Sequence, residues 1–191
     1  MVNAGSNTVS MFTIDDYNPT QLAYVNTVSS RGEFPLSVTA SADTNSACVF
    51  NGGNNGSVSC YRIHMNGLVP IGDSFQALNL NQTNPPKGPP GTGSRIAFSS
   101  NGELLYVTVK GNPMTNATGY VNTYTMVSGV MQNATTVNTG AMSLPFGFVE
   151  TPNNGLMISD AGYGFDVMEL KNLMPMVTDA YNISGQMASC W

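Results

Sequence analysis

The sequence predicts an all-β fold, and more narrowly a partial β-propeller made of four-stranded antiparallel blades. Three observations support this prediction. A short glycine turn recurs about every 50 residues, the spacing typical of propeller blades. Apolar and polar residues alternate in short runs beside these turns, as they do in half-buried strands. No stretch of the sequence has the periodicity of a long amphipathic helix.

The recurring turn is the feature from which the blades are counted. Its four copies read Asn3-Ala4-Gly5-Ser6, Asn51-Gly52-Gly53-Asn54, Val109-Lys110-Gly111-Asn112 and Asp160-Ala161-Gly162-Tyr163. They divide one partial propeller domain (residues 1–191) into the outer half of a blade (1–30), three complete blades (31–83, 91–140 and 141–184) and the start of the next blade (185–191). Closed propellers have about four to eight blades. We therefore expect the remaining blades to be missing or on another chain, with a small complete sandwich as the alternative.

Turn residues separate the strands that we expect within each unit. The first unit has a tight turn at Gly5 and strands over residues 8–12 and 21–28. The next three units have expected strands at 34–41, 47–50, 58–63 and 68–78, at 95–99, 104–109, 120–126 and 130–137, and at 146–150, 156–159 and 165–170, with a turn at 153–155. Residues 172–183 hold a last outer strand or a short helix. The Pro-rich segment 84–91 is expected to form a rigid loop over one face, and 112–119 a loop insertion.

Charge is scarce in this chain of 191 residues. Charged residues make up 9% of it, against about a quarter in typical globular proteins, while 41% of the residues are hydrophobic. The formal net charge of −5 and the six Lys and Arg residues argue against nucleic-acid binding, which needs clustered cations. No apolar run approaches the roughly 18 residues of a membrane-spanning helix. The low charge is typical of secreted all-β proteins.

Two of the three cysteines occupy matched positions around one turn. Cys48 and Cys60 flank the Asn/Gly cluster 51–56, so on a hairpin they face each other at a separation that a disulfide can span. We predict this disulfide, with a pair of buried thiols as the alternative. Cys190 is left over and is either buried, free or paired outside this chain. The disulfide and the low charge together predict an extracellular, secreted protein.

Five N-glycosylation sequons and one histidine complete the candidates that sequence motifs identify. The sequons begin at Asn55, Asn81, Asn116, Asn133 and Asn182. Because Asn, Ser and Thr are abundant, a similar number would arise by chance, and the sequons add little to the prediction of secretion. A single histidine cannot build a multi-His zinc site, and His64 is expected at a surface strand end. No motif for a nucleotide, metal or catalytic serine is present, so no cofactor or metal is predicted.

Propeller geometry selects further candidates without a motif. In a four-stranded blade, the loop leading into the innermost strand and the turn after the second strand lie on one face, close to the central channel. The turns would carry Asn3, Asn51, Lys110 and Asp160 towards this mouth. The leading loops would carry Arg31 and Glu33, then Ser94 and Arg95, then Pro145 and Phe146, and finally Gln186.

Charged residues at these positions predict chemical roles. Arg95 and Lys110 form a cationic pair that can hold a carboxylate or phosphate, and Glu33 or Asp160 can act as acid or base. The predicted catalytic residues are Glu33, Arg95 and Asp160, and the predicted residues for binding a small anionic substrate are Lys110, Asn51 and Gln186. The alternative is that these charges form salt bridges between neighbouring blades.

Three segments of the chain resemble a known family. Residues 2–12, 32–38 and 96–107 are similar to the lactonase-type seven-bladed propellers, which include phosphogluconolactonases and carboxymuconate cyclases, and most of all to secreted fungal members. The resemblance implies that about half of the propeller lies outside this chain. It also implies lactone hydrolysis or lactonising isomerisation without a cofactor.

The chain departs from the pattern of the family's catalytic members at two places. Those members tend to place a His before the inner strand and an Asp-x-Gly turn after the second strand. Here the segment 92–95 has no His, and of the compared turns only Asp160-Ala161-Gly162 keeps the acid. Two functions therefore remain open. The chain is a secreted lactone hydrolase or cycloisomerase, or it is a non-catalytic secreted or cell-surface glycoprotein that binds a ligand or a protein.

Overall fold

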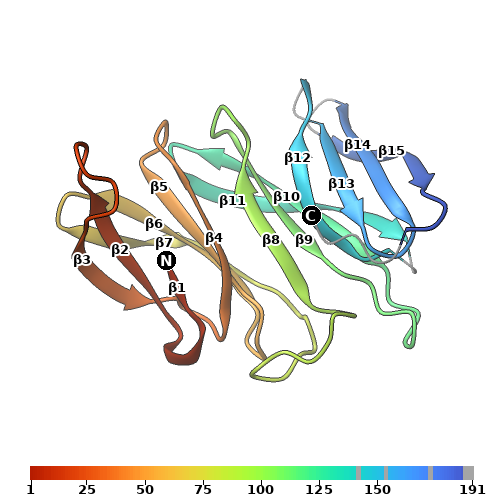
Figure 1. Cartoon of the computed structure of the whole chain (residues 1–191), viewed down its shortest axis with the longest axis horizontal. Helices are drawn as coiled ribbons and strands as arrows, with labels where there is room; N and C mark the ends of the chain where they lie inside the picture. Colours follow the sequence, from red (N-terminus) through yellow and green to blue (C-terminus); the bar gives the residue numbers. More distant parts are fainter. Residues whose placement is uncertain (141–142, 153–154, 172–173, 187–191) are drawn as a thin grey trace.

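Four antiparallel sheets stand side by side and form a partial β-propeller (Figure 1). The structure, a computed structural model, describes residues 1–140, 143–152, 155–171 and 174–186. In every sheet the strands that pair are consecutive in the chain. Each sheet is therefore a simple meander, as the alternation of strands and turns predicts. We call them the first to the fourth sheet in chain order.

The first sheet has three strands and the second has four. The first contains β1 (Val2–Asn3), β2 (Thr8–Ile14) and β3 (Leu22–Ser29), with a single 3-10 turn, η1 (Ala4–Ser6), between β1 and β2. The second contains β4 (Pro35–Ser41), β5 (Ser46–Asn51), β6 (Ser57–His64) and β7 (Gly67–Ala77). These strands confirm the expected ones to within a few residues, because period-two patterns and Gly/Asn turns locate strand ends well.

The third and fourth sheets each have four strands. The third contains β8 (Gly93–Phe98), β9 (Leu104–Val109), β10 (Gly119–Val127) and β11 (Val130–Gly140). The fourth contains β12 (Pro145–Glu150), β13 (Leu156–Asp160), β14 (Gly164–Lys171) and β15 (Met174–Asn182). The final element is thus a strand and not a short helix. Most of the expected start of the next blade (185–191) and most of the turn at 153–155 lie outside the described residues.

Apolar side chains fill the space between consecutive sheets. Strand β9 shows how one sequence serves two interfaces, because all six of its residues are buried. Leu105 and Val107 pack towards the second sheet, whereas Leu104 and Tyr106 pack towards the fourth. The alternation of a strand explains this division, since successive side chains point to opposite faces.

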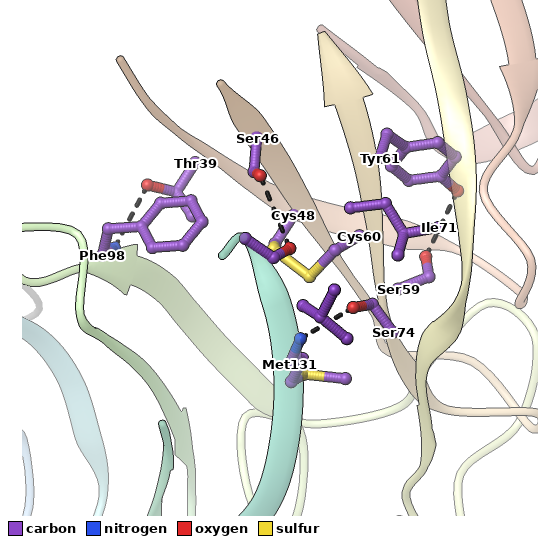
Figure 2. The surroundings of a disulfide bond; sticks show 12 residues. Thr39, Ser46, Cys48, Ser59, Cys60, Tyr61, Ile71, Ser74, Phe98 and Met131 are labelled. Carbon is purple, nitrogen blue, oxygen red and sulfur yellow. Dashed lines mark hydrogen bonds between the residues drawn. A yellow bond between two sulfur atoms is a disulfide. The ribbon is translucent and has the colours of Figure 1, made fainter. Parts of the chain in front are cut away.

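The predicted disulfide joins β5 to β6 in the core of the second sheet (Figure 2). Cys48 and Cys60 are register partners with their Cα atoms 4.1 Å apart, and neither is exposed. Nearby, the Ser74 hydroxyl accepts a hydrogen bond of 2.7 Å from the Met131 amide. The bridge closes a loop of 12 residues, for which chain-entropy arguments give about 3 kcal/mol of stabilisation.

The turns after the second strands lie beside the loops that lead into the innermost strands, along the lower edge of Figure 1. Backbone hydrogen bonds join them: Gly52 N donates to Phe34 O, Lys110 N to Thr92 O and Ala161 N to Leu144 O. The predicted common face is therefore confirmed for these three sheets. The Pro-rich segment 84–91 contains no strand and reaches this face.

Candidate functional site

The four glycine turns are not in the same register. In three sheets, we take as equivalent the residues that pair with the first residue of the innermost strand. The pairs are Asn51–Pro35, Val109–Gly93 and Asp160–Pro145. The residue of the third sheet that matches Asn51 and Asp160 is therefore Val109 and not Lys110. The prediction that Lys110 shares their position is wrong by one residue.

This offset decides which way each side chain points. Because strand side chains alternate between faces, a shift of one residue moves a side chain to the other side of its sheet. Asn51 and Asp160 have no exposed surface, so they do not lie open at a mouth as predicted. Asn51 Nδ2 instead donates to Ser30 O at 2.9 Å and to Ser57 Oγ at 3.0 Å. It thereby fastens the leading loop of its own blade.

The side chain of Lys110 lies in a different environment from those of Asn51 and Asp160, beside the innermost strands of the third and fourth sheets. Its Nζ donates to Gly93 O and to Ser94 Oγ, both at 2.7 Å. The same atom lies 4.4 Å from the centre of the Phe146 ring, a distance at which an ammonium is attracted to an aromatic face. The side chain is 5% exposed. The cation is therefore held in one position by two oxygen acceptors and a ring.

A hollow of about 300 Å³ opens beside this ammonium. Its wall is assembled from three sheets and the Pro-rich loop, and includes Phe34, Leu36, Pro86, Ser94, Lys110 and Phe146. Aromatic and aliphatic surface around one cation is an arrangement suited to a small organic anion, whose charged end meets the ammonium and whose body meets the apolar wall. The structure thus places Lys110, one of the three predicted binding residues, at the wall of such a hollow.

Asp160 holds the leading loop of the fourth sheet. Its carboxylate accepts a hydrogen bond from the Ser143 hydroxyl, bonds of 3.0 and 3.1 Å from the Leu144 amide, and a bond of 2.7 Å from the Gly162 amide. Ser143 O in turn accepts 2.9 Å from the Gly111 amide, in the Lys110 turn. Asp160 therefore does not line the hollow itself. It positions the loop that leads to Phe146, which does line it.

Asp166, on β14, is a buried acid that the sequence reasoning missed. It has no exposed surface, accepts a hydrogen bond from the Tyr163 hydroxyl and lies beside Asp160. Burial, opposed by the hydrogen bond from Tyr163 and assisted by the neighbouring Asp160 carboxylate, raises the pKa of Asp166 to about 6. Burial also raises the pKa of Tyr163. The feature of the sequence that could have identified Asp166 is an acidic residue at a core-facing position of its strand, two residues before Met168.

Arg95 lies at a different hollow from Lys110. Its side chain is exposed, donates from Nη1 to Phe148 O at 2.8 Å and stacks 4.9 Å over the Phe148 ring. The hollow that it lines measures about 410 Å³ and includes Phe148 and Phe165. The structure therefore does not bring Arg95 and Lys110 together as an anion-binding pair.

Glu33 and Gln186 lie next to other predicted residues. Glu33 Oε1 accepts 3.2 Å from Asn55 Nδ2, and its buried Oε2 has no hydrogen-bond partner in the described part of the chain. Glu33 immediately precedes Phe34, which lines the Lys110 hollow. Gln186 Nε2 donates 2.9 Å to Asp160 O, beside the fourth-sheet turn.

The remaining candidates are on the surface. His64 is exposed at the end of β6, as predicted. All five sequon asparagines, Asn55, Asn81, Asn116, Asn133 and Asn182, are exposed, and their glycosylation stays a prediction. Within residues 1–140, 143–152, 155–171 and 174–186, no group of three or more His, Cys, Asp or Glu residues is arranged to hold a metal ion. The same residues contain no helix that could cross a bilayer.

The chain shares its architecture with the lactonase-type β-propellers. A candidate 6-phosphogluconolactonase of Bacteroides fragilis matches with a TM-score of 0.67 and 18% identity, over 92% of this chain and 48% of that chain. A second, of Bacteroides uniformis, matches with a TM-score of 0.64 and 15% identity, over 94% and 49%. The periplasmic gluconolactonase of Pseudomonas aeruginosa matches with 0.58 and 15%, over 84% and 46%.

These likenesses establish the fold. The chain spans about half the length of the solved structures it matches. No family model and no curated protein matches the chain in sequence. Roles for individual residues therefore come from the geometry of this chain and not from an alignment.

Proposed function

We propose that the hollow beside Lys110 binds a small organic anion of the lactone or sugar-acid class, in a propeller with lactonase-like function. The observation that carries the proposal is the position of the Lys110 ammonium, fixed by Gly93 O and Ser94 Oγ at the wall of an otherwise largely apolar hollow. A fixed cation loses little freedom when a ligand binds, which favours binding of an anion. The volume of about 300 Å³ suits a single small ring.

The lactonase-like part of the proposal is supported by the fold and by the names of the neighbours, which are gluconolactonases and candidate 6-phosphogluconolactonases. Opening or closing a lactone needs an acid or base at the ring oxygen. Of the two predicted acid/base groups, Glu33 and Asp160, Glu33 is the one whose neighbour in the chain, Phe34, lines the hollow. We therefore assign the acid/base role to Glu33 and the anion-binding role to Lys110. The same two roles would serve a carboxymuconate-type cycloisomerase, so that predicted activity is part of the same proposal.

A second function is favoured by the positions of the other two predicted catalytic residues. Asp160 is buried and saturated with donors, and Arg95 lines another hollow. A propeller with an anion-binding hollow and no acid/base group in reach would be a non-catalytic binding protein. The disulfide supports placing either protein outside the cell.

Binding is tested by calorimetric titration of the chain with 6-phosphogluconate, a stable sugar-acid phosphate. Lys110→Met is expected to weaken binding by about 10- to 100-fold, the value of one charge-assisted contact. The matched control is Lys87→Met, which removes the same charge from an exposed position of the Pro-rich loop. Equal affinities of all three proteins would overturn the assignment of the hollow.

Catalysis is tested separately by following hydrolysis of gluconolactone and of muconolactone. If Glu33 is the acid/base group, Glu33→Gln abolishes turnover and leaves 6-phosphogluconate affinity within about twofold, because the amide keeps the size of the side chain. Binding without turnover in the unmodified chain would select the non-catalytic function.

A further inference from the structure

A second hollow lies beside the Lys110 hollow, between the second and third sheets. Its volume is about 270 Å³. One wall is the start of the segment that links β7 to β8, and the opposite wall is the loop 112–118 between β9 and β10. We call it the linker hollow. Both of the sheets that enclose it have sheets of this chain on either side, so the linker hollow lies inside the row of sheets and not at one of its ends.

The floor of the linker hollow is the end of the apolar core between these two sheets. Leu80 and Val109 are 8% and 3% exposed and belong to this core. Tyr120 of β10 is half-buried and packs against the same core. Since strand side chains alternate between faces, Tyr120 lies on the same side of β10 as the buried Tyr124. The floor therefore offers apolar surface and the ring of one phenol.

Hydrogen bonds hold both walls of the linker hollow in place. In the linking segment, Gln82 Nε2 donates to Gly91 O at 3.1 Å, and the Gly91 amide donates to Gly111 O at 2.9 Å. In the opposite wall, the backbones of Asn112 and Ala117 exchange two hydrogen bonds of 2.8 and 3.0 Å. A site that is already ordered loses little conformational freedom when it binds a ligand, which favours affinity.

Other polar groups of the linker hollow are available to a ligand. The Asn79 amide, Asn112 Nδ2 and the Tyr120 hydroxyl line the hollow and form no hydrogen bond with the described part of the chain. An amide and a phenol can each donate and accept. The buried Asn51 amide differs, because its Nδ2 is already bonded to Ser30 O and Ser57 Oγ. The linker hollow thus combines walls fixed by hydrogen bonds with unused donors and acceptors.

The charge of the linker hollow excludes the kind of ligand that suits its neighbour. Lys110 alone is charged among the described residues that line it, and its ammonium is bonded to Gly93 O and Ser94 Oγ, at the neighbouring hollow. Amides, a phenol and apolar surface match a ligand with hydroxyl groups at its edge and C–H groups on its face. A neutral pyranose ring has both.

We propose that the linker hollow binds a neutral sugar ring. The C–H face of the sugar lies on Leu80 and Tyr120, and its hydroxyl groups bond to Asn79, Asn112 and the Tyr120 hydroxyl. The volume of about 270 Å³ limits the ligand to a single ring. This site is separate from the anion-binding hollow, and neither needs the other in order to bind its ligand.

The test is saturation-transfer difference NMR of the whole protein with the methyl glycosides of glucose, galactose, mannose and N-acetylglucosamine. We expect at least one of them to bind with a dissociation constant on the order of 1 mM, because a single ring makes few contacts. A bacterial host that adds no N-glycans is used for expression. Asn81, which lines the hollow, and Asn116 of the loop 112–118 are sequon asparagines and then stay unmodified.

Two substitutions remove single polar groups from the linker hollow. Tyr120→Phe keeps the ring and removes the hydroxyl, and Asn79→Ala removes an exposed amide. Each should weaken binding of the glycoside by about 3- to 10-fold, the value of one hydrogen bond. The matched controls are Tyr17→Phe, at a side chain that is 99% exposed, and Asn133→Ala, at an exposed position of β11. Both controls should leave the affinity unchanged.

Competition separates the linker hollow from the Lys110 hollow. Saturating 6-phosphogluconate should leave saturation transfer to the glycoside unchanged, because the proposed anion site is the Lys110 hollow. Displacement of the glycoside would mean that it occupies the anion site, and would overturn the proposal.

Two further results would also overturn it. The absence of saturation transfer to all four glycosides would show that the linker hollow takes no neutral sugar. Binding that both Tyr120→Phe and Asn79→Ala leave unchanged would place the sugar elsewhere on the protein.

Discussion

The turns of the third and fourth sheets carry similar sequence signals but perform different tasks. Both contain a charged residue one or two positions before a glycine, at the end of a second strand. Asp160 has no exposed surface and binds the loop next to it, whereas Lys110 lies one residue later and lines a hollow with Phe146. The register pairs Val109–Gly93 and Asp160–Pro145 account for the difference. A single-residue offset separates a scaffold residue from a candidate binding residue.

This comparison predicts a separation of effects. Changes at Asp160 and at its equivalents should act on stability, because their polar groups are matched to buried backbone donors or acceptors. Changes at Lys110 should act on ligand binding. The following substitutions test this division in order of decreasing effect on stability.

Asp160→Ala should have the largest effect. The substitution leaves the amides of Leu144 and Gly162 without their carboxylate acceptor, and unsatisfied buried donors cost about 1–3 kcal/mol each. We expect a loss of about 3 kcal/mol in the free energy of unfolding, measured by urea denaturation. Asp15→Ala is the control, since Asp15 also accepts two backbone amides but is exposed. Equal losses at both sites would contradict the comparison.

Asp166→Asn should change how stability depends on pH. The pKa of Asp166 rises from 3.8 to about 6 on folding, so the folded state holds a proton that the unfolded state releases in this range. This contribution to stability is complete below pH 3.8 and is lost as the pH rises to about 6.

The measurement is urea denaturation at a series of pH values from 4 to 7. The unmodified chain should lose stability on going up this range, and Asp166→Asn should lose less, because its amide does not titrate. Asp179→Asn, at an exposed position of the neighbouring strand β15, should leave the pH profile unchanged. Parallel profiles for all three proteins would show that Asp166 does not hold its proton.

Asn51→Ala should have an intermediate effect, a loss of about 2 kcal/mol, because Ser30 O and the Ser57 hydroxyl both lose a buried partner. Asn3→Ala at the partly exposed end of the first sheet should cost less than about 1 kcal/mol, since water can replace the lost bonds. A larger loss at Asn3 in the same urea experiment would mean that its side is covered in solution.

Lys110→Met should have a smaller effect on stability than Asp160→Ala or Asn51→Ala, about 1 kcal/mol, because Met keeps the length and apolar contacts of the side chain. The same variant should show the largest loss of 6-phosphogluconate affinity. A thermal melt and a titration on one preparation measure both quantities. A large loss of stability with unchanged affinity would assign Lys110 to the scaffold, like Asp160.

Most of the secondary structure was predictable from local patterns. Strand β9 was expected at its observed bounds, and the Cys48–Cys60 pair followed from a hairpin centred on an Asn/Gly turn. Both features depend on the period-two alternation of strands and on residues a few positions apart. The final outer element was ambiguous as strand or helix, and pairing with β14 made it a strand.

The candidate site was predictable only in part. The position of Lys110 near the channel was expected, but its separation from Arg95 and the burial of Asn51 and Asp160 were not. Asp166 was missed because its environment comes from Tyr163 and Asp160, which reach it only across strands and turns.

The sequence by itself determined the strands, the turns, the disulfide and the kind of fold, because each depends on short-range periodicity and turn chemistry. Only the tertiary structure decided towards which face of its sheet each polar side chain at the turns points. Whether Lys110 faces a hollow or a neighbouring sheet depends on which residue of β8 pairs with Val109. That register is set by contacts between residues far apart in the chain, and a shift of one residue reverses the face.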